Sequence, residues 1–176
     1  VIPMLPHKLS NGICSLNPGV ERLAISCVME IDNNGKTVDY EIFPSIIKSR
    51  LQMTYKKVNQ VIEKNEIPEG YEPFVNDLKL MDELSQIIRK AKINRGYIDF
   101  DVDEAKIIVD ENCHPTDIVL RNRGVGENLI EDFMIQANEC VATHIFYMDL
   151  PFIYRVHEYP KEEKIRDFIS FVQSLG

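Results

Sequence analysis

Several features that are common in other classes of protein are missing from this sequence of 176 residues. No apolar run approaches the roughly 20 residues that a membrane-spanning helix needs, so we expect no contact with a membrane. The first residues contain no basic segment followed by an apolar one, so we expect no secretory signal. There is also no internal repeat and no low-complexity linker, and the length fits one domain.

The cysteines lack the close spacing of a metal site. There are four of them, and none belongs to a CxxC pair: Cys14, Cys27, Cys113 and Cys140. A zinc site built on Cys113 and His114 would need distant partners, because close pairs of ligands are missing. Scattered cysteines of this kind are typical of reduced thiols, so we expect a cytoplasmic protein.

The sequence has few positive charges for a free-standing nucleic-acid-binding protein. Lys and Arg total 20 against 28 for Asp and Glu, which gives a net charge of −8. A free-standing binder normally presents a basic face. The densest basic cluster is small and consists of Lys48, Arg50, Lys56 and Lys57. Otherwise the composition, 44% apolar and 27% charged, is that of a globular protein.

Hydrophobic periodicity predicts a β-hairpin followed by two helices in the first half of the chain. Apolar residues alternate over 23–31 and again over 37–43, with an Asn-Asn-Gly turn between them. Pro44 is expected to interrupt the second strand, with an extension through Ile46 and Ile47 beyond a bend as an open alternative. Helical spacing then predicts a short helix that begins after Thr54 as its N-cap, and a long amphipathic helix over 72–94.

The second half of the chain continues the same alternation of strands and helices. The pattern predicts strands over 98–102, 105–109, 116–120 and 152–156, and helices over 127–148 and 160–175. The apolar stripe of the first of these helices, centred near Ile130 and Ala137, is expected to face the core. This order of elements predicts an α+β fold in which helices pack against a mostly antiparallel β-sheet.

The most conspicuous acidic cluster is a candidate for metal binding. It consists of Asp99, Asp101, Asp103 and Glu104. An EF-hand loop would require glycine at the position that Glu104 occupies. Strand alternation explains the cluster more simply, because the apolar residues between the aspartates would point inward and the aspartates would face water. We therefore interpret the cluster as a solvated surface and keep the metal site as an alternative.

Three polar residues on the predicted helices have two interpretations each. Glu131 and Asn138 share one edge of the apolar stripe, roughly 90° from its centre. A carboxylate at such a boundary reaches a neighbouring cleft or forms ordinary surface ion pairs. Tyr55 is either a core aromatic on a helix face or a hydroxyl beside cations, which suits a phosphate group.

Three segments resemble the catalytic (RNB) domain of the ribonuclease II/ribonuclease R family. The first is IPMLP-x-x-LS-x-x-x-CSL-x-P at residues 2–18, whose prolines and Ser-Asn-Gly turn predict a rigid connector without regular structure. The second is SRLQMTY at residues 49–55, and the third is LIEDFMIQAN at residues 129–138. The resemblance covers essentially the whole chain and places it in the centre of the catalytic domain of a ribonuclease R-like enzyme.

The resemblance implies roles for three residues, and the basic cluster around Tyr55 adds two cations. Tyr55 would bind the RNA phosphate at the active site through its hydroxyl. Glu131 would contact the terminal nucleotide, and Asn138 would support that contact. Lys48 and Arg50 are nearby cations that are expected to attract the phosphate backbone.

One element of the family pattern differs in this sequence. The family holds the 3′ end of RNA by stacking bases between aromatic side chains, an interaction worth about 1–3 kcal/mol per base. Asp99 stands at one of these aromatic positions. The resemblance therefore leaves Tyr97 or Phe100 as the substitute.

The resemblance implies a 3′→5′ exoribonuclease that uses Mg²⁺ to hydrolyse single-stranded RNA to nucleoside 5′-monophosphates, with no DNA partner expected. The family's metal-binding aspartate motif precedes the connector, its arginine-rich element follows the last helix, and neither is in this sequence. We therefore expect residues 1–176 to be one partial domain, inactive by itself, with RNA affinity supplied by flanking modules. The alternative is a non-enzymatic acidic α+β module for protein interactions, favoured by the negative charge and the incomplete active site.

Overall fold

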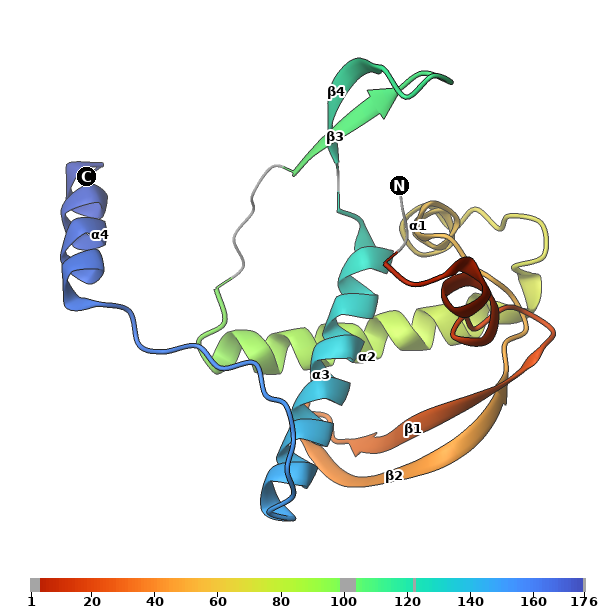
Figure 1. Cartoon of the computed structure of the whole chain (residues 1–176), viewed down its shortest axis with the longest axis horizontal. Coiled ribbons are helices and arrows are strands. Elements are labelled where there is room, and N and C mark those ends of the chain that lie inside the picture. The colour runs from red at the N-terminus through yellow and green to blue at the C-terminus, as the bar shows by residue number, and fades with distance from the viewer. Residues whose placement is uncertain (1–3, 99–103, 122, 176) are drawn as a thin grey trace. The chain divides into compact units, whose positions relative to one another are not determined.

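The structure is a computed structural model that describes residues 4–98, 104–121 and 123–175. The chain divides into two compact units, Val1–Val141 and Ala142–Gly176. The first unit contains a β-hairpin, two helices, a second hairpin and most of a long helix, and the second unit contains a final helix (Figure 1). The predicted α+β class is confirmed, and both hairpins are antiparallel.

The chain reaches the first hairpin through a short helical turn. Lys8–Ile13 form a π-helix, η1, so the prediction of a connector without regular structure is wrong at these residues. The carbonyl oxygen of Pro6 accepts hydrogen bonds from the N–H groups of Leu9 and Ser10 at 2.8 and 3.0 Å. The turn thus satisfies backbone groups that an irregular connector would leave to water.

Strands β1 (Glu21–Ile31) and β2 (Thr37–Lys48) form a hairpin that is longer than predicted. Pro44 does not interrupt β2 but lies opposite Ile25 in the ladder, so that prediction is wrong. In a two-stranded sheet the outer side of each strand is unpaired, and a proline is accepted where its missing N–H would point outward.

Helices α1 (Tyr55–Lys64) and α2 (Val75–Asn94) confirm the two predicted helices, and a 3₁₀ turn, η2 (Glu72–Phe74), precedes α2. Thr54 precedes α1 as predicted, but its side chain makes no capping hydrogen bond. Its N–H instead donates to the Tyr71 hydroxyl at 3.1 Å. Four buried side chains form a core between these elements: Val58, Val61, Tyr71 and Leu78.

The turn of the first hairpin touches α2. The Asp32 carboxylate accepts the N–H of Lys36 at 2.9 Å, and this hydrogen bond lowers the pKa of Asp32 below its ordinary value. Gly35 has a φ of 76°. A Cβ at this position would lie 2.7 Å from the Cβ of Ala91 and 2.9 Å from the carbonyl oxygen of Ile87. Only glycine therefore fits between this turn and the helix.

Strands β3 (Glu104–Val109) and β4 (Pro115–Arg121) form the second hairpin and confirm the strands predicted over 105–109 and 116–120. The strand predicted over 98–102 lies, except for its first residue, outside the described residues. The described strands form two separate two-stranded sheets and not one larger sheet.

The long helix α3 (Val125–Tyr147) buries a different face from the one predicted. Within the first unit its buried side chains include Leu129, Asp132, Gln136 and Cys140. Met134 of the predicted apolar stripe is 57% exposed, and Ile130 is 36% exposed. The prediction is wrong because the polar side chains of Asp132 and Gln136 can be buried on this face. Each of them has a hydrogen-bond partner on another element, Lys92 and Thr37 respectively, so neither is left unsatisfied. In the described parts of the chain, no helix is long and apolar enough to span a membrane.

The second unit contains the helix α4 (Glu162–Ser174), which confirms the last predicted helix. The prediction of a strand over 152–156 is wrong, because these residues have no regular secondary structure. Their apolar side chains are largely exposed, including Ile153 at 94% and Val156 at 77%. An alternating sequence forms a strand only where a second strand accepts its backbone hydrogen bonds.

Candidate functional site

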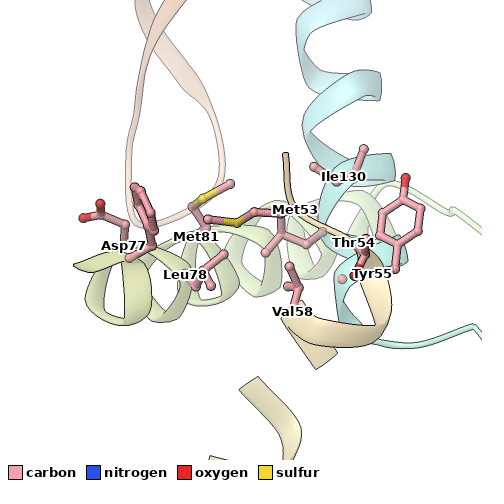
Figure 2. A pocket seen from close by; sticks show the side chains of 11 residues that line it. Met53, Thr54, Tyr55, Val58, Asp77, Leu78, Met81 and Ile130 are labelled. Atoms are coloured by element: carbon pink, nitrogen blue, oxygen red, sulfur yellow. The ribbon is translucent and has the colours of Figure 1, made fainter. Parts of the chain in front are cut away.

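A pocket of about 430 Å³ lies between α1, α2 and α3 in the first unit (Figure 2). Its lining is mostly apolar and includes Met53, Val58, Leu78, Met81 and Leu129. Tyr55 and Ile130 lie at one end of the pocket, and Asp77 lies at the other. Apolar pockets with a few polar groups at the rim are typical of binding sites.

Tyr55 is the first residue of α1 and lines this pocket. It is 43% exposed, so it is not the core aromatic of the alternative interpretation. Its side chain therefore borders the pocket and is partly open to solvent. A tyrosine hydroxyl in such a place can donate a hydrogen bond to a bound anion.

Glu131 follows Ile130 on α3, and Ile130 lines the pocket whereas Glu131 is not among the lining residues. Its side chain is 27% exposed. The carboxylate forms an ion pair with Arg123, and it lies 3.8 Å from the ammonium group of Lys92. The Tyr97 hydroxyl donates to it at 3.5 Å. Glu131 is therefore held from several sides and is not a freely moving surface carboxylate.

The buried residue next to Glu131 anchors α3 to α2. Asp132 has 0% exposure, and its carboxylate lies 2.7 Å from Lys92 and 3.6 Å from Arg89. The Ser85 hydroxyl donates to it at 3.1 Å. Lys92 also lies 4.1 Å from the centre of the Tyr97 ring, within the range of a cation–π interaction. Lys92 thus connects the buried carboxylate to both Glu131 and Tyr97.

A second set of hydrogen bonds joins α1 to the start of α3. The Asn59 amide donates to Glu127 at 3.1 Å and accepts the N–H of Gly126 at 2.7 Å. Glu127 also accepts the N–H of Gly124 at 3.1 Å. The first N–H groups of a helix have no partner within the helix, so side chains that accept them fix its position.

The other predicted site residues lie at the surface. Lys48, Arg50 and Asn138 are exposed, and none of them is among the residues that line the pocket. Asn138 is two helical turns beyond Glu131 on α3. Asp99 and Phe100 lie outside the described residues, whereas Tyr97 lies against the Glu131 carboxylate. The structure therefore places Tyr55 at the pocket, and it gathers Tyr97, Lys92 and Arg123 around Glu131.

The described residues do not fit the Mg²⁺ that the resemblance implies. Among them, no group of three His, Cys, Asp or Glu residues could hold a metal ion. The Glu131 carboxylate is already paired with two cations. The candidate zinc ligands are exposed, and His114 lies 3.6 Å from Asp110. Of the acidic cluster, Asp99, Asp101 and Asp103 lie outside the described parts of the chain, and Glu104 is the first residue of β3.

The four cysteines are free thiols. Cys27 on β1 and Cys140 on α3 lie with their sulfur atoms 3.7 Å apart. Burial raises the pKa of Cys140 to about 11, and the contact with Cys27 adds to this increase. A thiol with such a pKa is protonated at neutral pH and is a poor nucleophile. This pair is therefore packing between strand and helix.

Comparison with known proteins defines the class to which this fold and site belong. The RNB domain matches residues 1–175, so the chain belongs to the RNB domain family. The resemblance found in the three sequence motifs is confirmed.

The relatives identify the branch of the family. Ribonuclease R 1 of Lactococcus lactis is 50% identical over 177 residues, which cover 100% of this chain and 22% of that protein. Ribonuclease R of Thermotoga maritima is 48% identical, covering 100% of this chain and 25% of that protein. A solved structure of Mycoplasma genitalium RNase R in complex with ribose methylated single-stranded RNA has a TM-score of 0.92 at 34% identity, covering 98% of this chain and 27% of that one. The chain thus spans about a quarter of the length of these relatives.

Proposed function

We propose that the chain is the central part of a 3′→5′ exoribonuclease that hydrolyses single-stranded RNA to nucleoside 5′-monophosphates. The observation that carries this proposal is that Tyr55 lines a pocket which Leu129 and Ile130 also line. These two residues directly precede Glu131 on α3. Membership of the RNB domain family and the ribonuclease R relatives support it. The match of residues 1–175 to the RNB domain favours this proposal over the alternative of a non-enzymatic interaction module.

Each residue near the pocket has a chemical role in this proposal. The Tyr55 hydroxyl donates a hydrogen bond to a phosphate oxygen of the RNA. The Glu131 carboxylate accepts hydrogen bonds from hydroxyl groups of the terminal nucleotide, since hydroxyls are donors and phosphates would be repelled. Asn138 supports this contact from the next turns of α3.

Charge and stacking complete the proposed RNA contacts. Lys48 and Arg50 are exposed near the end of β2 and attract the phosphate backbone, which makes binding weaker as salt increases. Lys92 covers one face of the Tyr97 ring, and a base would stack on the opposite face. Because the whole chain has a net charge of −8, most of the RNA affinity of the full-length protein would come from other modules.

We expect the chain by itself to be inactive as a ribonuclease, because the described residues offer no set of ligands for a metal ion. In the proposed cytoplasmic enzyme, residues 1–176 are part of one catalytic domain whose Mg²⁺ ligands lie elsewhere. A 5′-labelled single-stranded RNA incubated with the chain and Mg²⁺ should remain full length on a gel. Thermotoga maritima ribonuclease R is the positive control, and a chelator is the negative one. Mg²⁺-dependent shortening of the RNA from its 3′ end would contradict this expectation.

The proposed roles are tested in the full-length protein that carries this chain. Tyr55→Phe removes the hydroxyl, and Glu131→Gln removes the charge at almost constant shape. We expect each to lower kcat/KM for single-stranded RNA by about 100-fold, the size typical of losing one preorganised polar contact to the reacting group. Steady-state kinetics with a short 5′-labelled RNA measure the effect.

Two exposed residues provide matched controls for these substitutions. Tyr159→Phe changes a tyrosine that is 98% exposed, and Glu139→Gln changes a half-exposed carboxylate further along α3. Both should leave kcat/KM unchanged. Equal activity of Tyr55→Phe, Glu131→Gln and the controls would refute the proposed site.

A further inference from the structure

A hydrogen bond between Asn59 and Glu127 joins α1 to α3 close to the residues of the proposed RNA contacts. Asn59 follows Tyr55 by four residues on α1, and Glu127 precedes Glu131 by four residues on α3. Residues four apart lie above one another on the same face of a helix. The two helices are therefore joined one turn away from each of the two residues that contact RNA in the proposed function.

This junction is closely packed as well as hydrogen-bonded. A Cβ on Gly124 would collide with the Asn59 amide nitrogen, and a Cβ on Gly126 would lie 2.9 Å from the Asn59 amide oxygen and 3.2 Å from Val58. Val58 and Gly126 also line the pocket beside Tyr55. The two glycines thus allow the helices to approach until the Asn59 side chain contacts the backbone of α3.

The directions of the hydrogen bonds leave little freedom at this junction. The Asn59 nitrogen donates to Glu127, and its oxygen accepts from the N–H of Gly126. Glu127 in turn accepts the N–H of Gly124. The N–H of the intervening Val125 donates to Glu63 of α1 at 3.0 Å. Three successive N–H groups at the start of α3 therefore have side-chain acceptors, which fixes both the position and the rotation of the helix.

We propose that Asn59 and Glu127 are positioning residues that set the separation and orientation of Tyr55 and Glu131. This inference rests on the proposed function of those two residues. Asn59 acts through the backbone of α1, and Glu127 acts through the backbone of α3; neither touches the RNA. A change at the junction displaces the Tyr55 hydroxyl relative to the Glu131 carboxylate, and displacements of about 1 Å at a reacting centre cost on the order of 100-fold in rate.

The first test exchanges the amide of Asn59 and the carboxylate of Glu127 in the full-length protein that carries this chain. Asn59→Asp removes the donor and places a second carboxylate beside Glu127, and we expect kcat to fall by about 10- to 100-fold. Adding Glu127→Gln returns a donor from the other side. The new amide nitrogen at position 127 would donate to the new carboxylate at position 59, which keeps the oxygen acceptor for Gly126. The Gly124 N–H loses its acceptor in this variant, because one oxygen of Glu127 accepts both the Asn59 amide and the Gly124 N–H. We expect the double variant to recover part of the lost kcat, because the hydrogen bond between positions 59 and 127 returns and the one from Gly124 does not.

A second test shows whether Asn59 positions the Tyr55 hydroxyl or only stabilises the fold, by asking whether the effects of two substitutions on kcat are additive. Asn59→Asp is also made in the Tyr55→Phe background, where the hydroxyl to be positioned is absent. If Asn59 positions that hydroxyl, its substitution lowers kcat by a much smaller factor in this background. A purely structural role would give the same factor in both backgrounds. Asn76→Asp, at an exposed position on α2, is the control for replacing an amide with a carboxylate.

The outcomes distinguish the inference from the proposed function. If Tyr55→Phe and Glu131→Gln both retain full activity, the proposed function fails, and the inference fails with it. If they lose activity while Asn59→Asp does not, only the inference is overturned. The same holds if Glu127→Gln gives no recovery, or if the factor is unchanged in the Tyr55→Phe background. Circular dichroism confirms that each variant is folded. Should Asn59→Asp not fold, Glu127→Asp, which keeps the charge but shortens the reach, is subject to the same background test.

Discussion

Replacing Lys92 with methionine is expected to lower the free energy of unfolding of the chain by about 3–5 kcal/mol, because a buried carboxylate then loses its ion-pair partner. Asp132 is fully buried, and Lys92 approaches it to 2.7 Å. Ser85 and Arg89 remain at 3.1 and 3.6 Å, but neither replaces the short contact with the ammonium group. Urea unfolding followed by far-ultraviolet circular dichroism measures the change.

Two further variants test the cause of this loss. Lys90→Met removes an exposed lysine from the same helix, and it should change the free energy of unfolding by less than about 1 kcal/mol. Lys92→Met combined with Asp132→Leu removes both buried charges, and it should recover much of the stability, since apolar pairs often replace buried ion pairs without loss. Similar losses for Lys90→Met and Lys92→Met would contradict the role of the buried pair.

Alanine at position 35 is expected to lower the free energy of unfolding by about 2–5 kcal/mol. The left-handed backbone at Gly35, with a φ of 76°, costs a residue with a Cβ about 1–2 kcal/mol. Overpacking against α2 adds about 1–3 kcal/mol, because the new Cβ would lie 2.7 Å from Ala91 and 2.9 Å from the Ile87 carbonyl oxygen. The same urea unfolding experiment measures the loss.

Gly19 is a matched control for the Gly35 prediction. Its φ is 74°, nearly the same, but no atom lies within 4 Å of the position that a Cβ would take. Gly19→Ala should therefore show only the backbone cost of about 1–2 kcal/mol. The difference between the two variants measures the contact of the hairpin turn with α2. Equal losses would show that this contact contributes nothing.

Local patterns in the sequence predicted the hairpins and helices of the first unit, because alternation and helical spacing are properties of neighbouring residues. The prediction errors arose where contacts between residues far apart in the sequence determine the local structure. Pro44 is accepted because β2 has an unpaired outer edge, and residues 152–156 form no strand although their sequence alternates. On α3 the polar residues Asp132 and Gln136 are buried. Their partners Lys92 and Thr37 are 40 and 99 residues away in the sequence.

The roles of the predicted site residues stay predictions, and the structure shows where these residues lie. Tyr55 and Glu131 came from motif resemblance, and the structure places Tyr55 at the pocket and Glu131 directly after a pocket residue of α3. Lys92 and Asn59 were missed, because a polar residue on a predicted helix is usually interpreted as facing solvent. A usable signal was present for Asn59, which lies one helical turn from a motif residue and so shares its face. For Lys92 no comparable local signal exists, since its partners lie on a different helix.

The position of Lys92 has a consequence for changing this protein by mutation and selection. One ammonium group contacts the carboxylate that anchors two helices, the carboxylate proposed to contact RNA, and an aromatic ring proposed to stack a base. A substitution at position 92 therefore alters folding and substrate recognition together, and selection for one property changes the other. Arg123 pairs with Glu131 from a position where its side chain is 40% exposed, so it offers a way to tune the site with a smaller effect on stability. Libraries intended to alter specificity should vary position 123 and keep position 92 fixed.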